Sequence, residues 1–295
     1  MARTAKMNMI MHGDGHGGVH HHDGLLNVNG IFENRFDVIL TNPPFGSRVE
    51  KTLKITEADR FTDQAKIDYY IKRYGDDYRN AMRQVNDNID KSVLDLYTSG
   101  KLSGLTEVLF IERCIRLLKP GGRMGIVLPE GVLNNTNLQN VRELFEGMAK
   151  IVLITSIPQD VFMASGATVK PSLLFFKKFT EEERLQFDTI QSEASIEISD
   201  KYSARINDID DAIADRSRPA EEKKKLRADK KALEEKMKSE IWTIVKSRFD
   251  YTIPIAQVQK AGITTTGAEC ENELTDLLQE YTPIVKSINC GYRKS

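Results

Sequence analysis

The chain has 295 residues, of which 40% are hydrophobic, and its formal net charge at pH 7 is −1. The length is ample for the core of one large or two small domains. The near-neutral charge excludes a global basic field, so any DNA contact must be local or supplied by a partner. Its apolar runs are too short to span a membrane, and three scattered cysteines, Cys114, Cys270 and Cys290, fit a reducing cytoplasm.

The first thirty residues predict a short helix that ends near Gly13, then a turn rich in glycine and histidine, then a candidate edge strand over 19–26. All five histidines lie between His12 and His22. A metal site is tempting there, but the segment has no cysteine partner and no ligand spacing of the zinc type. We therefore predict no metal.

Residues 36–40 predict a buried strand, and Asn42-Pro43-Pro44-Phe45 follows it. The two prolines fix two successive φ angles and remove two backbone donors. The rigid loop that remains offers an amide oxygen, free carbonyls and an aromatic ring, a set that suits an exocyclic amino group. The alternative is an ordinary turn, because Asn-Pro is a common turn signal.

Residues 46–103 are polar and too long for an ordinary connection, so we interpret them as a partly helical insertion and a candidate lid. An amphipathic helix follows over 105–118 and ends at Lys119-Pro120-Gly121-Gly122. The next expected elements are a strand over 124–128, a loop at 129–131, a helix over about 138–148, and strands over 151–157 and 172–178. Such alternation predicts an α/β domain over 1–180, with ligands beyond the carboxyl ends of the strands.

A second, C-terminal helical region is expected over 181–295. Its charged composition predicts a helical hairpin over 199–217 and 219–246, with Pro219 at a helix start. The hairpin is either simply solvated or a coiled-coil arm that meets another subunit. In the tail we expect a short apolar stretch over 253–258, a glycine-rich turn and a helix over about 271–288.

Several segments in this order resemble one family. They are residues 7–13, Asp23-Gly24-Leu25, the Asn42 to Phe45 loop, the helix ending at Lys119 to Gly122, and segments 128–133, 160–162, 170–178 and 261–267. Together they are similar to the modification (M) subunit of type I restriction-modification systems, an adenine-N6 DNA methyltransferase. The resemblance covers nearly the whole chain, and the insertion 46–103 is its least similar part.

The resemblance implies methyl transfer from S-adenosylmethionine to N6 of an adenine flipped out of DNA. Asn42 Oδ1 and the Pro43 carbonyl would accept the N6 hydrogens, Pro44 would keep the loop rigid, and Phe45 would stack on the base. Phe162 matches a family position whose ring covers the base, with a core Phe as the alternative. Asp23 matches an acidic residue that contacts the adenine end of the cofactor, with an exposed turn residue as the alternative.

Two family features do not occur in the sequence: a glycine-rich cofactor loop after a first strand, and an acidic residue after a second strand. The run from Gly13 to Gly18 follows a helix and is a weak substitute for that loop. We therefore expect a Rossmann-like methyltransferase sheet that lacks its first strands, as in the C-terminal portion of a longer protein. Two strand edges would then be exposed, and we expect the chain to be inactive alone.

The resemblance also implies partners. DNA would be bound through an assembled complex containing a specificity subunit, and a restriction subunit and a second M subunit are further candidates. One alternative function is a non-catalytic remnant or an assembly module that docks to the specificity subunit. A methyltransferase acting on a protein glutamine or an RNA base is another, which the long C-terminal helical region disfavours.

Overall fold

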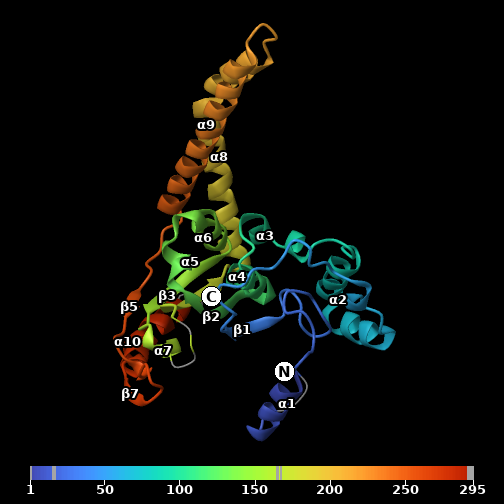
Figure 1. Cartoon of the computed structure of the whole chain (residues 1–295), viewed down its shortest axis with the longest axis vertical. Helices are drawn as coiled ribbons and strands as arrows, with labels where there is room; N and C mark the ends of the chain where they lie inside the picture. The colour runs from blue at the N-terminus through green and yellow to red at the C-terminus, as the bar shows by residue number, and fades with distance from the viewer. Residues whose placement is uncertain (1, 15–17, 164–165, 167, 291–295) are drawn as a thin grey trace. The chain divides into compact units, whose positions relative to one another are not determined.

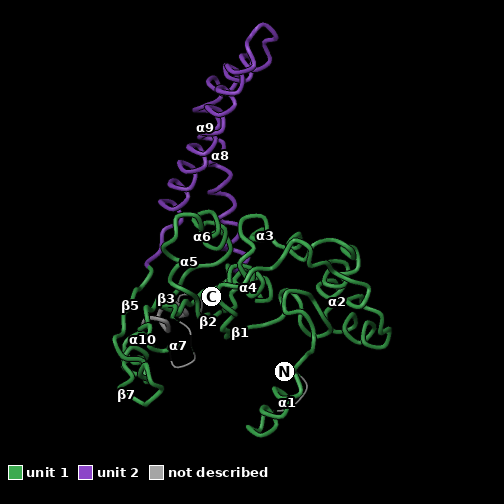
Figure 2. The backbone as a smooth tube through the Cα atoms, viewed as in Figure 1, with its two compact units in different colours: residues 1–179, 253–295 green, residues 180–252 purple. Residues whose placement is uncertain are grey.

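The computed structural model describes residues 2–14, 18–163, 166 and 168–290, with side chains as far as residue 283. The chain divides into two compact units (Figure 2), of which the first contains residues 1–179 and 253–295 and the second residues 180–252. The expected division at 180 placed the tail with the helical hairpin, whereas these units place residues 253–295 with the first unit. Each unit is described by itself below.

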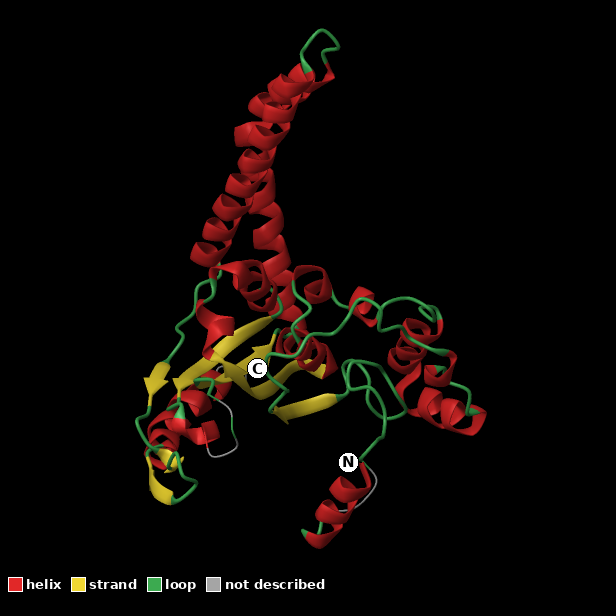
Figure 3. Ribbon diagram, in the orientation of Figure 1, coloured by secondary structure: helices red, strands yellow, loops and turns green. Residues whose placement is uncertain are grey.

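A mixed five-stranded sheet forms the centre of the first unit (Figure 3). Its strands are β1 (Phe36–Thr41), β2 (Leu118–Pro129), β3 (Ala149–Ser156), β4 (Pro171–Lys178) and β5 (Ile255–Gln257), in the order β1-β2-β4-β3-β5. The pairs β1·β2 and β3·β5 are parallel, and β4 is antiparallel to both of its neighbours. The predicted α/β sheet, followed by a C-terminal helical region, is confirmed.

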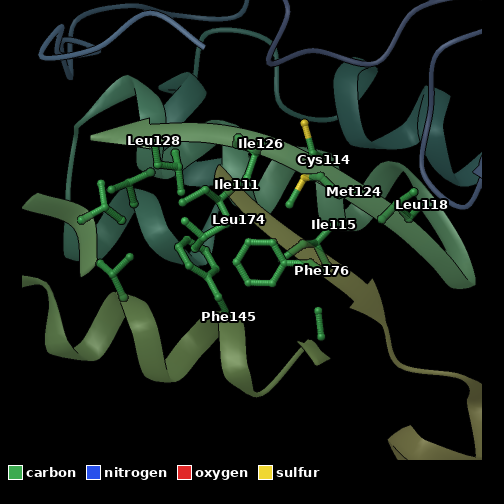
Figure 4. Packing of buried hydrophobic residues seen from close by; sticks show 14 of the residues in the cluster. Ile111, Cys114, Ile115, Leu118, Met124, Ile126, Leu128, Phe145, Leu174 and Phe176 are labelled. Carbon is green, nitrogen blue, oxygen red and sulfur yellow. The ribbon is translucent and has the colours of Figure 1, made fainter. Parts of the chain in front are cut away.

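Helices α4 (Thr106–Leu117) and α6 (Gln139–Glu146) pack on one face of this sheet. The apolar residues of α4 recur at the three- and four-residue spacing that predicted an amphipathic helix. Figure 4 shows its Ile111 and Ile115 with Phe145 of α6 and Phe176 of β4 in the resulting core. The shorter helices nearby are α3 (Thr98–Leu102), α5 (Glu130–Asn134) and α7 (Asp160–Met163).

The insertion 46–103 is partly helical, as predicted, and its main helix is α2 (Gln64–Asn86), kinked at Gly75. It builds a second apolar cluster against α4, which contains Leu25, Leu26, Ile55, Val85, Val93, Leu94, Tyr97 and Leu109. Helix α4 is therefore buried on two sides, between the sheet and the insertion. The role of the insertion as a lid stays a prediction.

Residues 19–26 form no strand, so that expectation was wrong. The N-terminal helix α1 (Ala2–Met11) forms as expected. In the segment after it, the Asp23 side chain accepts the Leu25 N–H and closes a turn. The carbonyls of Gly24 and Leu26 accept hydrogen bonds from Arg113 of α4 instead of from a neighbouring strand.

Strand β1 is less buried than its apolar sequence predicted, since Val38 is 63% and Leu40 79% exposed. Successive strand residues point to opposite faces, and only the face that carries Ile39 packs on the main core. Among the described strands, β1 pairs only with β2. Strand β1 is therefore an outer strand of this sheet.

The second unit is a hairpin of two long helices, α8 (Glu181–Ala214) and α9 (Ala220–Arg248). The predicted hairpin is confirmed, but its first helix begins 18 positions before the expected residue 199. The reason is a capping box, in which Thr180 and Glu183 exchange side-chain to backbone hydrogen bonds. Ile198, Tyr202 and Leu233 are buried along the seam between the helices.

The tail follows its predicted order of apolar stretch, turn and helix. The apolar stretch is β5, the turn region is a small antiparallel pair of β6 (Ala261–Ile263) and β7 (Glu269–Asn272), and the helix is α10 (Leu274–Cys290). Figure 1 labels β5, β7 and α10. None of the described helices has the length and apolarity needed to cross a membrane.

Candidate active site

The Asn42-Pro43-Pro44-Phe45 loop leaves the carboxyl end of β1, at one edge of the sheet. Because β1, β2 and β3 run in the same direction, the segments after β2 and β3 leave at this edge too. Pro43 is buried, Asn42 and Pro44 are exposed, and Phe45 is half-buried. The loop thus has a buried attachment and an accessible amide, as a binding loop requires.

Phe45 and Phe162 are brought together from distant parts of the chain. Their ring centroids lie 6.0 Å apart and the ring planes are at 89°, an edge-to-face pair. Phe162 belongs to α7, the short helix after β3. The two aromatic residues predicted to contact one ligand therefore lie side by side, although that contact itself stays a prediction.

The far end of the loop is fastened to the first turn of α4. Gly46, at φ +71°, donates its N–H to both carboxylate oxygens of Glu107, at 3.3 and 3.2 Å. The Ser47 carbonyl accepts from the backbone N–H of Thr106 at 2.9 Å and from its hydroxyl at 3.1 Å. Sequence reasoning missed Glu107, because an acidic residue in a first helical turn indicates only a favourable helix terminus.

The turn at Asp23 is fastened to the same helix by Arg113. This guanidinium is buried, and its three nitrogens donate to Gly24 O at 3.2 Å, Leu26 O at 2.8 Å and Asn27 Oδ1 at 2.6 Å. Asp23 itself is exposed. Sequence reasoning missed Arg113 as well, since nothing local distinguishes it from a solvated helix cation.

Other groups surround the loop. Asn42 borders an open, mostly apolar hollow of about 360 Å³, lined also by Leu40, Gly125, Leu173 and Phe175 among others. At the start of β4, Lys170 forms an ion pair with Glu130, which follows β2, at 3.3 Å. The exposed amide therefore lies beside an apolar surface, and a charge pair lies at the same edge of the sheet.

Comparison with known families identifies the chain. The family model of the Eco57I restriction-modification methylase matches residues 13–162, which is half of the sequence and includes the Asn42 loop, α4 and Phe162. The chain belongs to the Eco57I restriction-modification methylase family. The predicted resemblance to restriction-modification methylases is confirmed at this level.

Solved structures similar to this Eco57I-family chain include three methyltransferase-related proteins. A modification subunit of a putative type I restriction enzyme from Vibrio vulnificus is 21% identical, with 58% of this chain and 29% of that one covered and a TM-score of 0.37. The M protein of the type I restriction enzyme EcoKI is 22% identical, with 61% and 29% covered and a TM-score of 0.37. A putative class I S-adenosylmethionine-dependent methyltransferase from Listeria monocytogenes is 19% identical, with 55% and 36% covered and a TM-score of 0.31. The chain spans less than a third of the length of the first two.

Two histidines of this Eco57I-family chain have local partners. His22 Nε2 lies 3.3 Å from Asp59 Oδ1, and His12 Nδ1 lies 2.9 Å from Asn8 O. Burial lowers the pKa of His20, and the nearby cations Lys6 and Lys66 and the ring of His22 lower it further. Within the described residues, no group of three His, Cys, Asp or Glu side chains is placed to hold a metal. His16 and the rest of segment 15–17 of the Gly13 to Gly18 run lie outside the described residues.

Among the cysteines, Cys114 lies in the main core. Burial raises the pKa of its thiol from the ordinary value to about 12. Because the thiolate is the nucleophilic form, Cys114 is inert near neutral pH. The proposed chemistry therefore makes no use of Cys114.

Proposed function

We propose that this chain carries the base-binding site of a DNA adenine-N6 methyltransferase and works as part of an assembled enzyme. The observation that carries the proposal is the Asn42 to Phe45 loop at the carboxyl edge of the sheet, with Phe162 against Phe45 at 6.0 Å. Membership of a restriction-modification methylase family supports the reaction class. The finer assignment is to the modification subunit of a type I system.

The loop would hold the amino group of an adenine flipped out of the duplex, because a base in the stack is out of reach. The adenine N6 lone pair is delocalised into the ring and is a poor nucleophile. Hydrogen bonds from N6 to Asn42 Oδ1 and to the Pro43 carbonyl would localise that lone pair and orient it. Pro43 and Pro44 fix the backbone, so these acceptors are held in place before the base arrives.

Phe45 would stack on the flipped base, a contact worth about 1–3 kcal/mol in proteins that bind single strands. Phe162 meets the Phe45 ring edge-to-face and would line the same base site. No metal or covalent enzyme intermediate is needed for this direct transfer. The contribution of the protein is positioning.

S-adenosylmethionine would supply the methyl group, and the described residues fit it in part. The exposed carboxylate of Asp23 suits the adenine end of the cofactor, and Arg113 holds its turn in place. Among the described residues, no glycine-rich loop of the cofactor type follows a strand. The remaining cofactor contacts would come from another part of the assembled enzyme.

The proposed partners are DNA, bound through the complex, and a specificity subunit. A restriction subunit and a second modification subunit are further candidates. A net charge of −1 agrees with DNA recognition by a partner, and the α8–α9 hairpin offers a long surface for docking. We place the complex in the cytoplasm, where DNA and reduced cysteines coexist.

The proposal is tested with Asn42→Ala in the assembled enzyme, with Asn140→Ala as the control because Asn140 is also an exposed asparagine, on α6. Removing one preorganised hydrogen-bond partner of a transition state costs about 100-fold or more in kcat. Transfer of labelled methyl to DNA should fall by that factor in Asn42→Ala, with cofactor affinity unchanged, and stay at the wild-type level in Asn140→Ala. Wild-type turnover of Asn42→Ala would refute the assignment.

The second candidate is a non-catalytic assembly module, and it is favoured for the chain taken alone because Asp23 is the one residue for which we propose a cofactor contact. Calorimetry separates the two. We expect the isolated chain to bind S-adenosylmethionine weakly and the assembled enzyme to bind it well. Robust binding by the isolated chain would contradict the need for another polypeptide, whereas absence of binding in every assembly would favour the module.

A further inference from the structure

Glu107 is a buried carboxylate in the candidate site to which the proposed chemistry gives no role. It is 4% exposed and lies in the first turn of α4. A buried carboxylate is costly unless it is hydrogen-bonded. Its two carboxylate oxygens accept the Gly46 N–H, at 3.2 and 3.3 Å.

This hydrogen bond acts on the residue directly before Gly46. A peptide unit is planar, so holding the Gly46 N–H also holds the Phe45 carbonyl and the plane between the two residues. At its other end the loop is held by strand pairing, with Thr41 opposite Ile126. The four residues from Asn42 to Phe45 are therefore fixed at both ends, by the sheet and by Glu107.

We propose that Glu107 is the positioning residue of the base-binding loop, an inference that rests on the proposed function. It acts through the Phe45–Gly46 peptide and does not touch the base. Its carboxylate sets the direction of the Phe45 ring and, through the rigid prolines, that of the Asn42 amide. Loss of this anchor would leave the loop attached but misaligned.

Glu112 provides a matched control on the same helix. It is equally buried, at 2% exposed, and its carboxylate also accepts backbone N–H groups. Those groups belong to Thr98 and Ser99, at 3.1 and 2.7 Å, at the start of α3. Glu107 and Glu112 therefore share residue type, helix and burial but anchor different segments.

The first experiment compares Glu107→Ala, Glu107→Gln and Glu112→Ala in the assembled enzyme, and measures kcat, the KM for S-adenosylmethionine and thermal unfolding. A misplacement of about 1 Å costs on the order of 100-fold in rate, so we expect Glu107→Ala to lower kcat by about 10- to 100-fold. The KM for the cofactor should not change. Glu107→Gln should recover most of kcat, since its amide oxygen still accepts the Gly46 N–H, and Glu112→Ala should lose stability but keep kcat.

Equal losses of kcat in Glu107→Ala and Glu112→Ala would overturn the inference, because they would indicate general destabilisation. A wild-type kcat in Glu107→Ala would overturn it too. If Asn42→Ala is inactive while Glu107→Ala is fully active, the inference fails and the proposed function stands. If Asn42→Ala is active, the proposed function fails.

The second experiment uses the full chain alone and needs no activity. Amide hydrogen exchange should lose protection at Gly46 in Glu107→Ala and at Thr98 and Ser99 in Glu112→Ala. If Glu107→Ala does not fold, Glu107→Asp gives the same readout, because the shorter side chain keeps the charge but not the reach. Retained protection at Gly46 in a folded Glu107 variant would overturn the inference.

Discussion

The Asn42 loop and the Asp23 turn are fastened to the same helix in opposite ways. Glu107 accepts a hydrogen bond from the loop, and Arg113, six positions further along α4, donates three to the turn. At 1.5 Å per residue the two anchors are about 9 Å apart along the helix axis. One helix thus sets the positions of two segments that the chain places on either side of β1.

The two segments differ in how much of their structure is local. The loop continues a strand, and two prolines restrict its φ angles. Its backbone conformation is therefore determined largely by adjacent residues. The turn has no regular structure, and three of its polar groups depend on a side chain almost ninety residues away. We expect the turn to depend on its anchor for folding and the loop to depend on its anchor for alignment.

The largest expected effect on stability is that of Arg113→Ala. Each hydrogen bond from a charged group contributes about 1.5–3 kcal/mol, and this change leaves three acceptors of the turn without their donor, so we expect a loss of about 3 kcal/mol or more. Arg79→Ala is the control, because its ion pair with Asp76 is exposed and worth well under about 1 kcal/mol. Urea unfolding and hydrogen exchange of residues 24–27 measure both.

If Arg113→Ala were as stable as Arg79→Ala, the turn would be held by something other than the guanidinium. The contrast between a locally determined loop and an anchored turn would then be wrong.

Two substitutions test whether the loop and the turn bind different ligands. Phe45→Ala should weaken binding of DNA with an unstacked target base by about 1–3 kcal/mol and leave cofactor affinity unchanged. Asp23→Asn should do the reverse. Its amide oxygen can still accept the Leu25 N–H, but loss of the negative charge should raise the KM for S-adenosylmethionine by about 10-fold. Fluorescence of 2-aminopurine at the target position and methyl-transfer kinetics in the assembled enzyme supply the two readouts. Parallel losses in both variants would show that the segments do not serve separate ligands.

The smallest expected effect concerns two glycines. Gly46 has a φ of +71° and open space where a Cβ would be, so Gly46→Ala should cost about 1–2 kcal/mol through backbone strain alone. Gly46→Asn should cost less, because asparagine tolerates that conformation. Gly24 differs from Gly46, because a Cβ added there would lie 3.0 Å from the Phe110 ring, so Gly24→Ala acts through steric crowding. Thermal unfolding that ranks Gly46→Asn below Gly46→Ala would contradict strain as the cause.

The sequence predicts those parts of the molecule whose structure depends on neighbouring residues. The helix α4, the strands β1 to β4 and the loop after β1 follow from periodicity and proline chemistry. Thr180 and Glu183 are three residues apart, as in a capping box, so the sequence also indicates the start of α8. The expected start at residue 199 did not use this signal.

Glu107 and Arg113 could not be recognised as anchors from the sequence. Their partners lie 61 and more than 80 positions away, and single-sequence patterns carry no information on such distant pairs. For the same reason residues 19–26 were expected to be a strand. The Gly24 and Leu26 carbonyls instead accept hydrogen bonds from the buried Arg113 guanidinium, which no local pattern indicates.

The central claim is that the Asn42 loop holds N6 of adenine, and the most direct test is the identity of the methylated nucleoside. DNA treated with the assembled enzyme and labelled S-adenosylmethionine is digested, and its nucleosides are analysed by mass spectrometry. We predict labelled N6-methyladenine with the wild-type chain and at least about 100-fold less with Asn42→Ala. N4-methylcytosine as the product, or undiminished N6-methyladenine with Asn42→Ala, would contradict the account.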